Sequence, residues 1–73
     1  MYLSEYVLAQ ADRDDAVGDL ARDAAADETW PHQANSVRLS QYLAGQVNAG
    51  EQAFVALQSA AREHRRQEFE NGG

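Results

Sequence analysis

The sequence predicts an all-α fold, a compact bundle of four helices, and three observations support this class. Apolar residues recur at intervals of three and four in four separate segments, which is the spacing that places them on one helix face. No stretch alternates apolar and polar residues with a period of two, so no sheet is expected. The chain has 73 residues and no cysteine, which limits it to one small domain without disulfides. We expect this domain to span residues 1–70, with residues 71–73 as a disordered tail.

The first two predicted helices are separated by the acidic sequence DRDD. The first helix spans about residues 2–11, and its apolar stripe comprises Leu3, Tyr6 and Val7. Asp15 is placed to cap the second helix, because its carboxylate can accept hydrogen bonds from the unpaired amides of the first turn. Gly18 indicates the close approach of another backbone, since glycine costs about 1 kcal/mol relative to alanine inside a helix. The buried stripe of the second helix comprises Val17, Leu20, Ala21 and Ala24.

The segment DETWPHQANS, residues 27–36, contains the only tryptophan and the only proline of the chain. Pro31 restricts Trp30 to an extended conformation, so the second helix must end before it. Trp30 is then either a core residue at the corner between two helices or an exposed anchor for a partner, since tryptophan is frequent at binding hot spots. We favour the core role, because a buried tryptophan contributes about 3–5 kcal/mol relative to alanine. The side chains expected to converge on it are Leu3, Tyr6, Leu20 and Tyr42.

The third and fourth helices are predicted after this corner. Asn35 or Ser36 caps the third helix, and Gly45 closes it. Its inward face comprises Leu39, Tyr42 and Leu43. The fourth helix spans about residues 50–68 and is the longest, with Asn48 as its predicted cap. Its apolar face comprises Phe54, Leu57 and Ala61, with Val55 beside them.

Five motifs stand in order along about residues 1–65: YLSEYVL, DDAVGDLA, DETWP, LSQYL and AFVALQSAAREH. Together they resemble the YozE family of small bacterial proteins, whose fold is similar to the sterile alpha motif (SAM) domain. The chain departs from the family at Ala16, where the family has proline, and after Phe54, where the family often carries further aromatic residues. The resemblance implies a compact four-helix SAM-like bundle, and it implies no catalytic activity. Folds of this kind serve as protein-binding and sometimes as nucleic-acid-binding modules, which is an analogy of fold alone.

The negative charge of the chain is concentrated in its first part. Residues 1–28 contain eight acidic residues and two arginines, a net charge of −6, which equals that of the whole chain. Such a surface does not attract nucleic acid, because that affinity comes mainly from the neutralisation of phosphates. Asp15, Asp19 and Asp23 advance by four and lie off the apolar stripe, so they form a candidate surface for a basic protein partner. The simpler alternative is that they provide solubility and a charged helix N-terminus.

The basic residues gather near the end of the fourth helix, at Arg62, Arg65 and Arg66. Cations at this position are favoured by the helix dipole, and the neighbouring glutamates Glu63, Glu68 and Glu70 dilute the cluster. The alternative is that these arginines contact phosphates, in which case the protein would be associated with nucleic acid. We regard nucleic acid as possible but disfavoured by the net charge.

Metal sites, cofactors and catalysis have little support in the sequence. The two histidines, His32 and His64, lie on different segments, and the acidic DRDD break lacks the glycine and the glutamate of a calcium loop. We therefore expect no metal and no cofactor. Paired carboxylates that perform acid–base chemistry need a pocket, and a bundle of this size is expected to have little room for one. We therefore expect no enzyme, and we expect binding to occur on charged surface and not in a pocket.

Compartment and function follow from the same features. No apolar run approaches the about 18 residues of a membrane span, the N-terminus has no basic start, and cysteine is absent, so we expect a cytoplasmic protein. The predicted function is that of a small non-enzymatic protein-interaction module or accessory protein. One alternative is an acidic inhibitor, of the kind found in phages and plasmids, that occupies a nucleic-acid-binding protein. Another is a nucleic-acid-associated protein that uses the arginines of the fourth helix.

Overall fold

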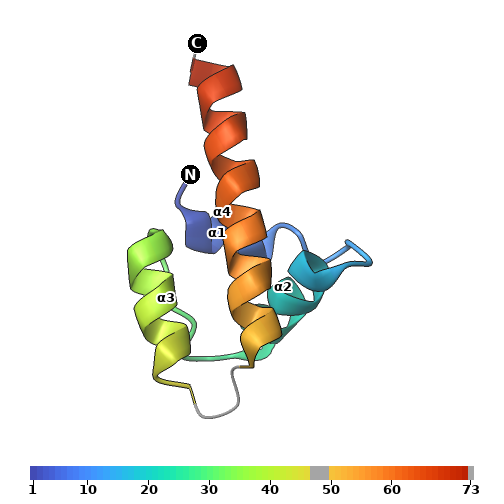
Figure 1. Cartoon of the computed structure of the whole chain (residues 1–73), viewed down its shortest axis with the longest axis vertical. Helices are drawn as coiled ribbons and strands as arrows, with labels where there is room; N and C mark the ends of the chain where they lie inside the picture. The colour runs from blue at the N-terminus through green and yellow to red at the C-terminus, as the bar shows by residue number, and fades with distance from the viewer. Residues whose placement is uncertain (47–49, 73) are drawn as a thin grey trace.

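The computed structural model describes residues 1–46 and 50–72, which form α-helices and no strand (Figure 1). The helices are α1 (Leu3–Leu8), α2 (Ala16–Ala26), α3 (Ser36–Ala44) and α4 (Glu51–Gly72). Helix α4 packs against each of the other three, and α1 also contacts α2 and α3. The predicted all-α class and the four-helix bundle are thereby confirmed. Among the described residues, no helix has both the length and the apolar character needed to cross a membrane.

The helix ends follow local sequence signals. The Asp15 carboxylate accepts a hydrogen bond from the Gly18 amide at 2.9 Å, and the Asn35 side chain accepts one from the Arg38 amide at 3.0 Å. Both predicted caps are therefore present, with Asn35 rather than Ser36 as the cap of α3. The predicted cap of α4, Asn48, lies outside the described residues.

Two helix boundaries differ from the prediction. Helix α1 ends at Leu8 and continues into turns, so it is shorter than the predicted span of residues 2–11. Helix α4 continues past the predicted end at residue 68 to Gly72. Helix length beyond the packed region depends on the intrinsic helix preference of residues 65–70, among which no proline or glycine interrupts the turn.

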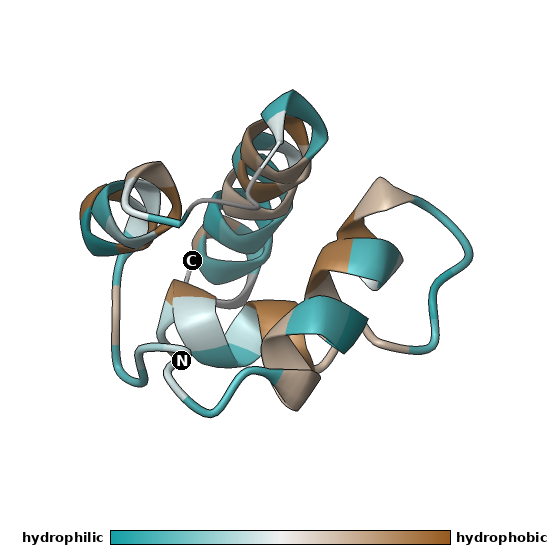
Figure 2. Ribbon diagram, turned by 90° about the horizontal axis from the view of Figure 1, so that it is seen from below, coloured by the Kyte–Doolittle hydropathy of each residue, from teal (hydrophilic) through white to brown (hydrophobic). Residues whose placement is uncertain are grey.

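The core lies where α1, α2 and α3 meet α4 (Figure 2). The predicted stripes of α1 and α2 are all buried, as are Leu39 and Leu43 of α3. On α4 the prediction needs correction, because Val55 is 51% exposed and Phe54 is only partly buried. The buried side chains of α4 are Ala56, Leu57 and Ala60, with Ala53, Phe54 and Ala61 packed at the margin. Because α4 packs against three helices, its small alanine side chains allow these neighbours to approach closely.

Gly18 marks a close approach of two backbone segments, as predicted. A Cβ atom built on Gly18 would lie 2.0 Å from the carbonyl oxygen of Arg13. The loop after α1 crosses the first turn of α2 at this point. The guanidinium of Arg22, one turn further along α2, also holds that loop, because it donates to the carbonyl oxygens of Ala11 and Arg13 at 2.8 and 2.9 Å.

Trp30 is a core residue, and its side chain is 4% exposed. Its indole N–H donates to the carbonyl oxygen of Ser4 at 3.3 Å, and the ring of Tyr42 meets it edge-on at a centroid distance of 5.8 Å. Leu3, Tyr6 and Leu20 belong to the same buried cluster, with Tyr42 packed against it. The core role predicted for Trp30 is therefore confirmed, and the exposed-anchor alternative is excluded.

A buried serine joins α1 to the segment before α3, which the apolar pattern of the sequence does not reveal. Ser4 is fully buried; its amide donates to the Ala34 carbonyl at 3.1 Å, and its Oγ accepts from the Ala34 amide at 2.9 Å. The Ser4 hydroxyl also donates to the Glu5 carboxylate. Glu5 in turn accepts from the amide of Gln33 at 2.7 Å, where the backbone has a φ of 53°. These bonds hold a left-handed residue in the corner.

Candidate binding groove

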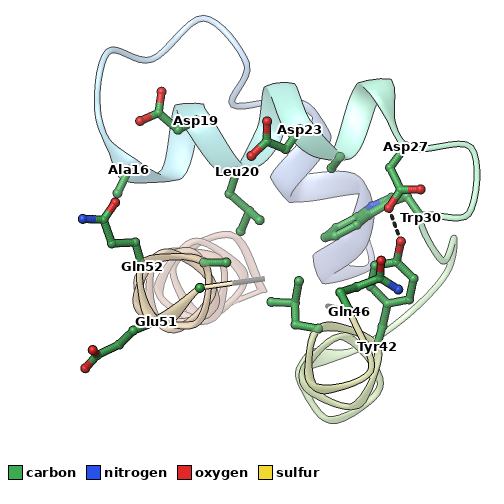
Figure 3. Close-up of a pocket in the computed structure, with 14 residues that line it drawn as sticks. Ala16, Asp19, Leu20, Asp23, Asp27, Trp30, Tyr42, Gln46, Glu51 and Gln52 are labelled. Atoms are coloured by element: carbon green, nitrogen blue, oxygen red, sulfur yellow. Dashed lines mark hydrogen bonds between the residues drawn. The ribbon is translucent and has the colours of Figure 1, made fainter. Parts of the chain in front are cut away.

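A groove lies between α2 and α3, beside the first turn of α4. Both α2 and α3 pack against α4, but within residues 1–46 and 50–72 they make no contact with each other (Figure 2). Trp30 lies in the space that separates them, and the remainder is an open groove of about 630 Å³ (Figure 3). The expectation that a bundle of this size has little room for a pocket is therefore wrong, because three helices that all pack on α4 do not have to close on one another.

The groove combines an apolar floor with an acidic rim. The apolar floor consists of Leu20, Ala24, Trp30, Leu43 and Ala53. The acidic rim consists of four carboxylates, Asp19, Asp23, Asp27 and Glu51. Three of these lie on or at the end of α2, whereas Glu51 is the first residue of α4 (Figure 3). Gln46 and Gln52 add amide groups, and no arginine or histidine occurs among the described residues that line the groove.

The carboxylates of the rim differ in how they are paired. Asp19 forms an ion pair with Arg22, one turn along α2. Asp23 and Glu51 are exposed, and within the described part of the chain neither carboxylate has a salt bridge or a side-chain hydrogen bond. Because no cation of the described chain neutralises these two groups, their charge faces solvent and attracts a basic ligand.

Asp27 supports the corner and also supplies charge to the groove. Its carboxylate accepts hydrogen bonds from the Tyr42 hydroxyl, from the Thr29 hydroxyl at 2.7 Å and from the Thr29 amide at 2.9 Å. The hydrogen bond from Tyr42, followed by those from Thr29, lowers the pKa of Asp27 below its ordinary value. Asp27 therefore stays ionised while it positions the ring of Tyr42 against Trp30.

The structure separates the three aspartates predicted as one partner surface. Asp19 and Asp23 line the groove, but Asp15 does not. The Asp15 carboxylate caps α2 and also accepts from Arg13 at 2.6 Å, and these contacts, with Gly18 first, lower its pKa. Asp15 therefore stabilises the N-terminus of α2. Asp27 and Glu51 were not among the three residues predicted to bind a partner. Asp27 continues the spacing of four from Asp15, whereas no local signal places Glu51 in the groove.

The arginines of the alternative nucleic-acid surface, Arg62, Arg65 and Arg66, are exposed on α4. Within the described residues none of them forms a salt bridge. Arg62 and Arg65 also border a shallow hollow of about 350 Å³ beside Ser36 and Ser40 of α3.

The glutamates expected to dilute this cluster are largely engaged elsewhere. Glu63 accepts from Tyr6 at 3.0 Å and from Arg13 at 3.0 Å. Glu68 lies 3.1 Å from the ring of His64 and 3.5 Å from the N-terminal amine. The charge of the three arginines is therefore less compensated than the sequence of α4 indicates.

The two histidines lie apart, as their separate segments indicated. His32 is exposed at the corner, whereas His64 packs against Tyr6 at a centroid distance of 5.2 Å. Among the described residues no group of three or more histidine, cysteine, aspartate or glutamate side chains is arranged to hold a metal ion.

Comparison with known proteins gives a family and no activity. The family model for the YozE SAM-like fold matches residues 4–64. This range contains the Trp30 corner, all of α2 and α3, and the part of α4 that packs in the core. No curated protein and no solved structure matches the chain. Because the match extends over most of the sequence and the bundle has the expected four helices, the chain belongs to the YozE SAM-like family.

Proposed function

We propose that this protein is a small non-enzymatic protein-interaction module, and that it binds a basic segment of a partner protein in the groove between α2 and α3. One observation carries the proposal: four carboxylates line the same groove as an apolar floor, with no arginine or histidine among the described lining residues. A helix or extended segment that presents apolar side chains flanked by arginine or lysine is the complementary ligand. Its apolar side chains would cover Leu20 and Ala53, and its cations would meet Asp23 and Glu51.

The arrangement of the rim favours a segment with several cations. Asp23 lies on α2 and Glu51 on α4, so the two carboxylates mark different edges of the groove, and Figure 3 shows the Glu51 side chain extending away from the space between α2 and α3. A cation beside Asp23 and a second beside Glu51 would fix the orientation of the segment over the floor. Exposed charges of this kind mainly raise the association rate and make binding sensitive to salt.

The electrostatics of the groove support binding over catalysis. A general acid or base that operates near pH 7 needs a carboxyl pKa raised toward that value. Asp27, the most extensively hydrogen-bonded carboxylate of the rim, has its pKa lowered instead. The cysteine-free composition fits action in a reducing compartment such as the cytoplasm.

Two alternatives use the same surfaces. If the partner is a nucleic-acid-binding protein, the acidic groove would occupy its basic surface and the protein would act as an inhibitor, as phage and plasmid proteins do. The second alternative, direct contact with nucleic acid, is favoured by the exposed Arg62, Arg65 and Arg66 and opposed by the net charge of −6. A gel shift at low salt that weakens steeply as salt rises would identify direct contact.

The proposal is tested with synthetic peptides and the fluorescence of Trp30, which is the only tryptophan and lines the groove. The probe is a tryptophan-free amphipathic helical peptide of leucine and arginine, and its control has glutamate in place of arginine. We expect the basic peptide to change the emission of Trp30 saturably at low salt, and the acidic peptide to leave it unchanged.

Two variants with the same change in charge locate the binding site. Asp19→Asn with Asp23→Arg alters the rim, whereas Asp12→Asn with Asp14→Arg alters exposed residues of the preceding loop that do not line the groove. The rim variant should weaken binding of the basic peptide by about tenfold or more, equivalent to 1.4 kcal/mol. Equal weakening by both variants would mean that net charge alone attracts the peptide, and the groove would then not be the site.

A further inference from the structure

The C-terminal part of α4 projects beyond the bundle (Figure 1). Residues 65–70 are all exposed, and Phe69 is 83% exposed, the highest value among the exposed large hydrophobic side chains in the described part of the chain. A helical segment of this length gains little stability from its own hydrogen bonds, because most helical stability in proteins comes from packing of an apolar face. An aromatic side chain at the end of such a projection is well placed to pack against another molecule.

Arg65 and Arg66 share the surface of this projection with Phe69, and Arg62 lies one turn before them. Arg62, Arg66 and Phe69 follow the i, i+4, i+7 spacing of one helix face, and Arg65 lies four residues before Phe69. We name Arg62, Arg65, Arg66 and Phe69 the basic tip. Of the neighbouring acids, Glu63 and Glu68 are engaged with the bundle and the N-terminus, which leaves Glu70. The basic tip therefore presents an apolar side chain flanked by cations.

The groove and the basic tip lie in different halves of α4. The groove is lined by Glu51, Gln52 and Ala53 at the start of the helix, and the basic tip extends from Arg62 near its middle to Phe69 near its end. The molecule is 39 Å long, and a continuous helix cannot bring its own C-terminal end back to its first turn (Figure 1). Any contact between the two surfaces must therefore join separate molecules.

We propose that the basic tip of a second copy of this chain occupies the groove. Phe69 of one copy would lie on the apolar floor beside Trp30 of the other, and the arginines would meet the carboxylates of Asp23 and Glu51. The inference rests on the groove being a docking site, as proposed above, and it names the occupant. Charge complementarity carries it: an acidic rim without a cation among its described lining residues faces a basic surface without an ion pair in the described chain.

The geometry of this contact determines the form of the assembly. Each copy would use a different surface from its neighbour, so the contact is heterologous and leaves one groove and one basic tip unoccupied at the ends. Addition can then continue, which gives open chains of molecules. Because the contact depends on exposed charges, it should weaken as the ionic strength rises.

The test measures the mass of the full chain by sedimentation velocity over a range of concentrations. At low salt the parent should grow beyond a dimer as concentration rises, and it should return toward a monomer at about 1 M salt, where screening acts within about 3 Å. The tip variant carries Phe69→Ser and Arg66→Glu, and the rim variant carries Asp19→Asn and Asp23→Arg. Each variant alone should stay monomeric, with an unchanged helical circular dichroism signal because all four positions are exposed.

Mixing the two variants gives the decisive result. The tip variant keeps an intact groove and the rim variant keeps an intact basic tip, so an equimolar mixture should form a heterodimer and grow no further. The matched control, Val55→Ser with Arg38→Glu, also replaces one exposed apolar and one exposed basic residue, and it should assemble like the parent. If Phe69→Ser with Arg66→Glu proves less helical than the parent, Arg66→Glu alone serves as the tip variant.

Three outcomes would overturn the inference. If the parent stays monomeric while the basic peptide still binds the groove, self-association is wrong and the groove serves another partner; if neither occurs, the proposed function fails as well. If the mixture of variants does not form a heterodimer although the parent associates, the surfaces pair in another way. If the parent shifts DNA at low salt and the tip variant loses this shift, nucleic acid is the ligand of the basic tip.

Discussion

Arg13 and Glu63, which are 50 residues apart in the sequence, form an ion pair that joins the loop after α1 to α4. The guanidinium also donates to Asp15 at 2.6 Å, and Glu63 accepts a further hydrogen bond from the Tyr6 hydroxyl at 3.0 Å. The contact therefore connects the start of α2, the middle of α4 and the core tyrosine of α1. The hydrogen bond from Arg13 is the main cause of the lowered pKa of Glu63.

The acid stability of the fold should depend on Glu63. Since the folded state lowers the pKa of Glu63, its contribution is present above the unfolded pKa of about 4.3 and is lost as pH falls through the folded pKa. Urea unfolding of the parent and of Glu63→Gln should differ by a constant amount above about pH 5 and converge at lower pH. A difference that persists unchanged at pH 2 would mean that the charge of Glu63 is not what stabilises the fold. Glu70→Gln, an exposed control, should change stability by less than about 0.5 kcal/mol.

Gly18→Ala should destabilise the domain, although alanine favours helix formation. The added Cβ would lie 2.0 Å from the backbone oxygen of Arg13, and a backbone atom cannot move aside as a side chain can. We expect the free energy of unfolding to fall by about 1–3 kcal/mol, which would be measured as a lower urea midpoint. Gly45→Ala is the control, because the nearest atom to a Cβ there is the Tyr42 carbonyl oxygen at 3.5 Å and its φ is −87°. Equal stability of Gly18→Ala and the parent would contradict the close approach.

Ser4→Ala should cost about 1–3 kcal/mol, because it leaves the buried amide of Ala34 without its hydrogen-bond acceptor. The change removes only one oxygen atom, so a loss of this size would come from the unpaired amide and not from a cavity. Ser40→Ala replaces an exposed serine of α3 and should be nearly neutral. Hydrogen exchange of the Ala34 amide checks the cause: exchange should become faster in Ser4→Ala, and an unchanged rate would contradict this role of Ser4.

Trp30→Ala should unfold the domain or nearly do so. The ring occupies part of the space between α2 and α3, and its loss costs about 3–5 kcal/mol, which is comparable to the total stability of a domain of this size. In the parent, Trp30 fluorescence should be blue-shifted and should move to longer wavelength on unfolding in urea. Circular dichroism of Trp30→Ala should show a large loss of helix, and a cooperative melt within a few degrees of the parent would contradict the core role.

Trp30→Phe separates packing from hydrogen bonding at the same position. Phenylalanine keeps an apolar ring but removes the N–H that donates to the Ser4 carbonyl. We expect a folded protein with a lower urea midpoint, intermediate between the parent and Trp30→Ala. Stability as low as that of Trp30→Ala would mean that an apolar ring alone does not stabilise this position, and that the N–H donor and the full indole are needed.

The sequence by itself determined the parts of this protein that depend on residues close along the chain. The caps at Asp15 and Asn35 and the corner at Pro31 arise from contacts within a few residues, and apolar spacing identified the buried faces of α1 and α2. The order of five short motifs was sufficient to indicate the family. The sequence could also indicate two members of the acidic rim, Asp19 and Asp23, because one helix carries both at a spacing of four.

Only the tertiary structure decided how these elements enclose a groove. Whether α2 and α3 touch depends on how each packs on α4, and the apolar stripes that direct both toward α4 do not specify the distance between them. Glu51 and Asp23 belong to different helices, and they line the same groove because of how α2 packs on α4. The burial of Ser4, on which the apolar pattern gives no information, and the exposure of Val55, which was placed beside the apolar face of the fourth helix, likewise depend on tertiary packing. In each case the deciding contacts come from residues far apart in the sequence, where periodicity carries no information about distance.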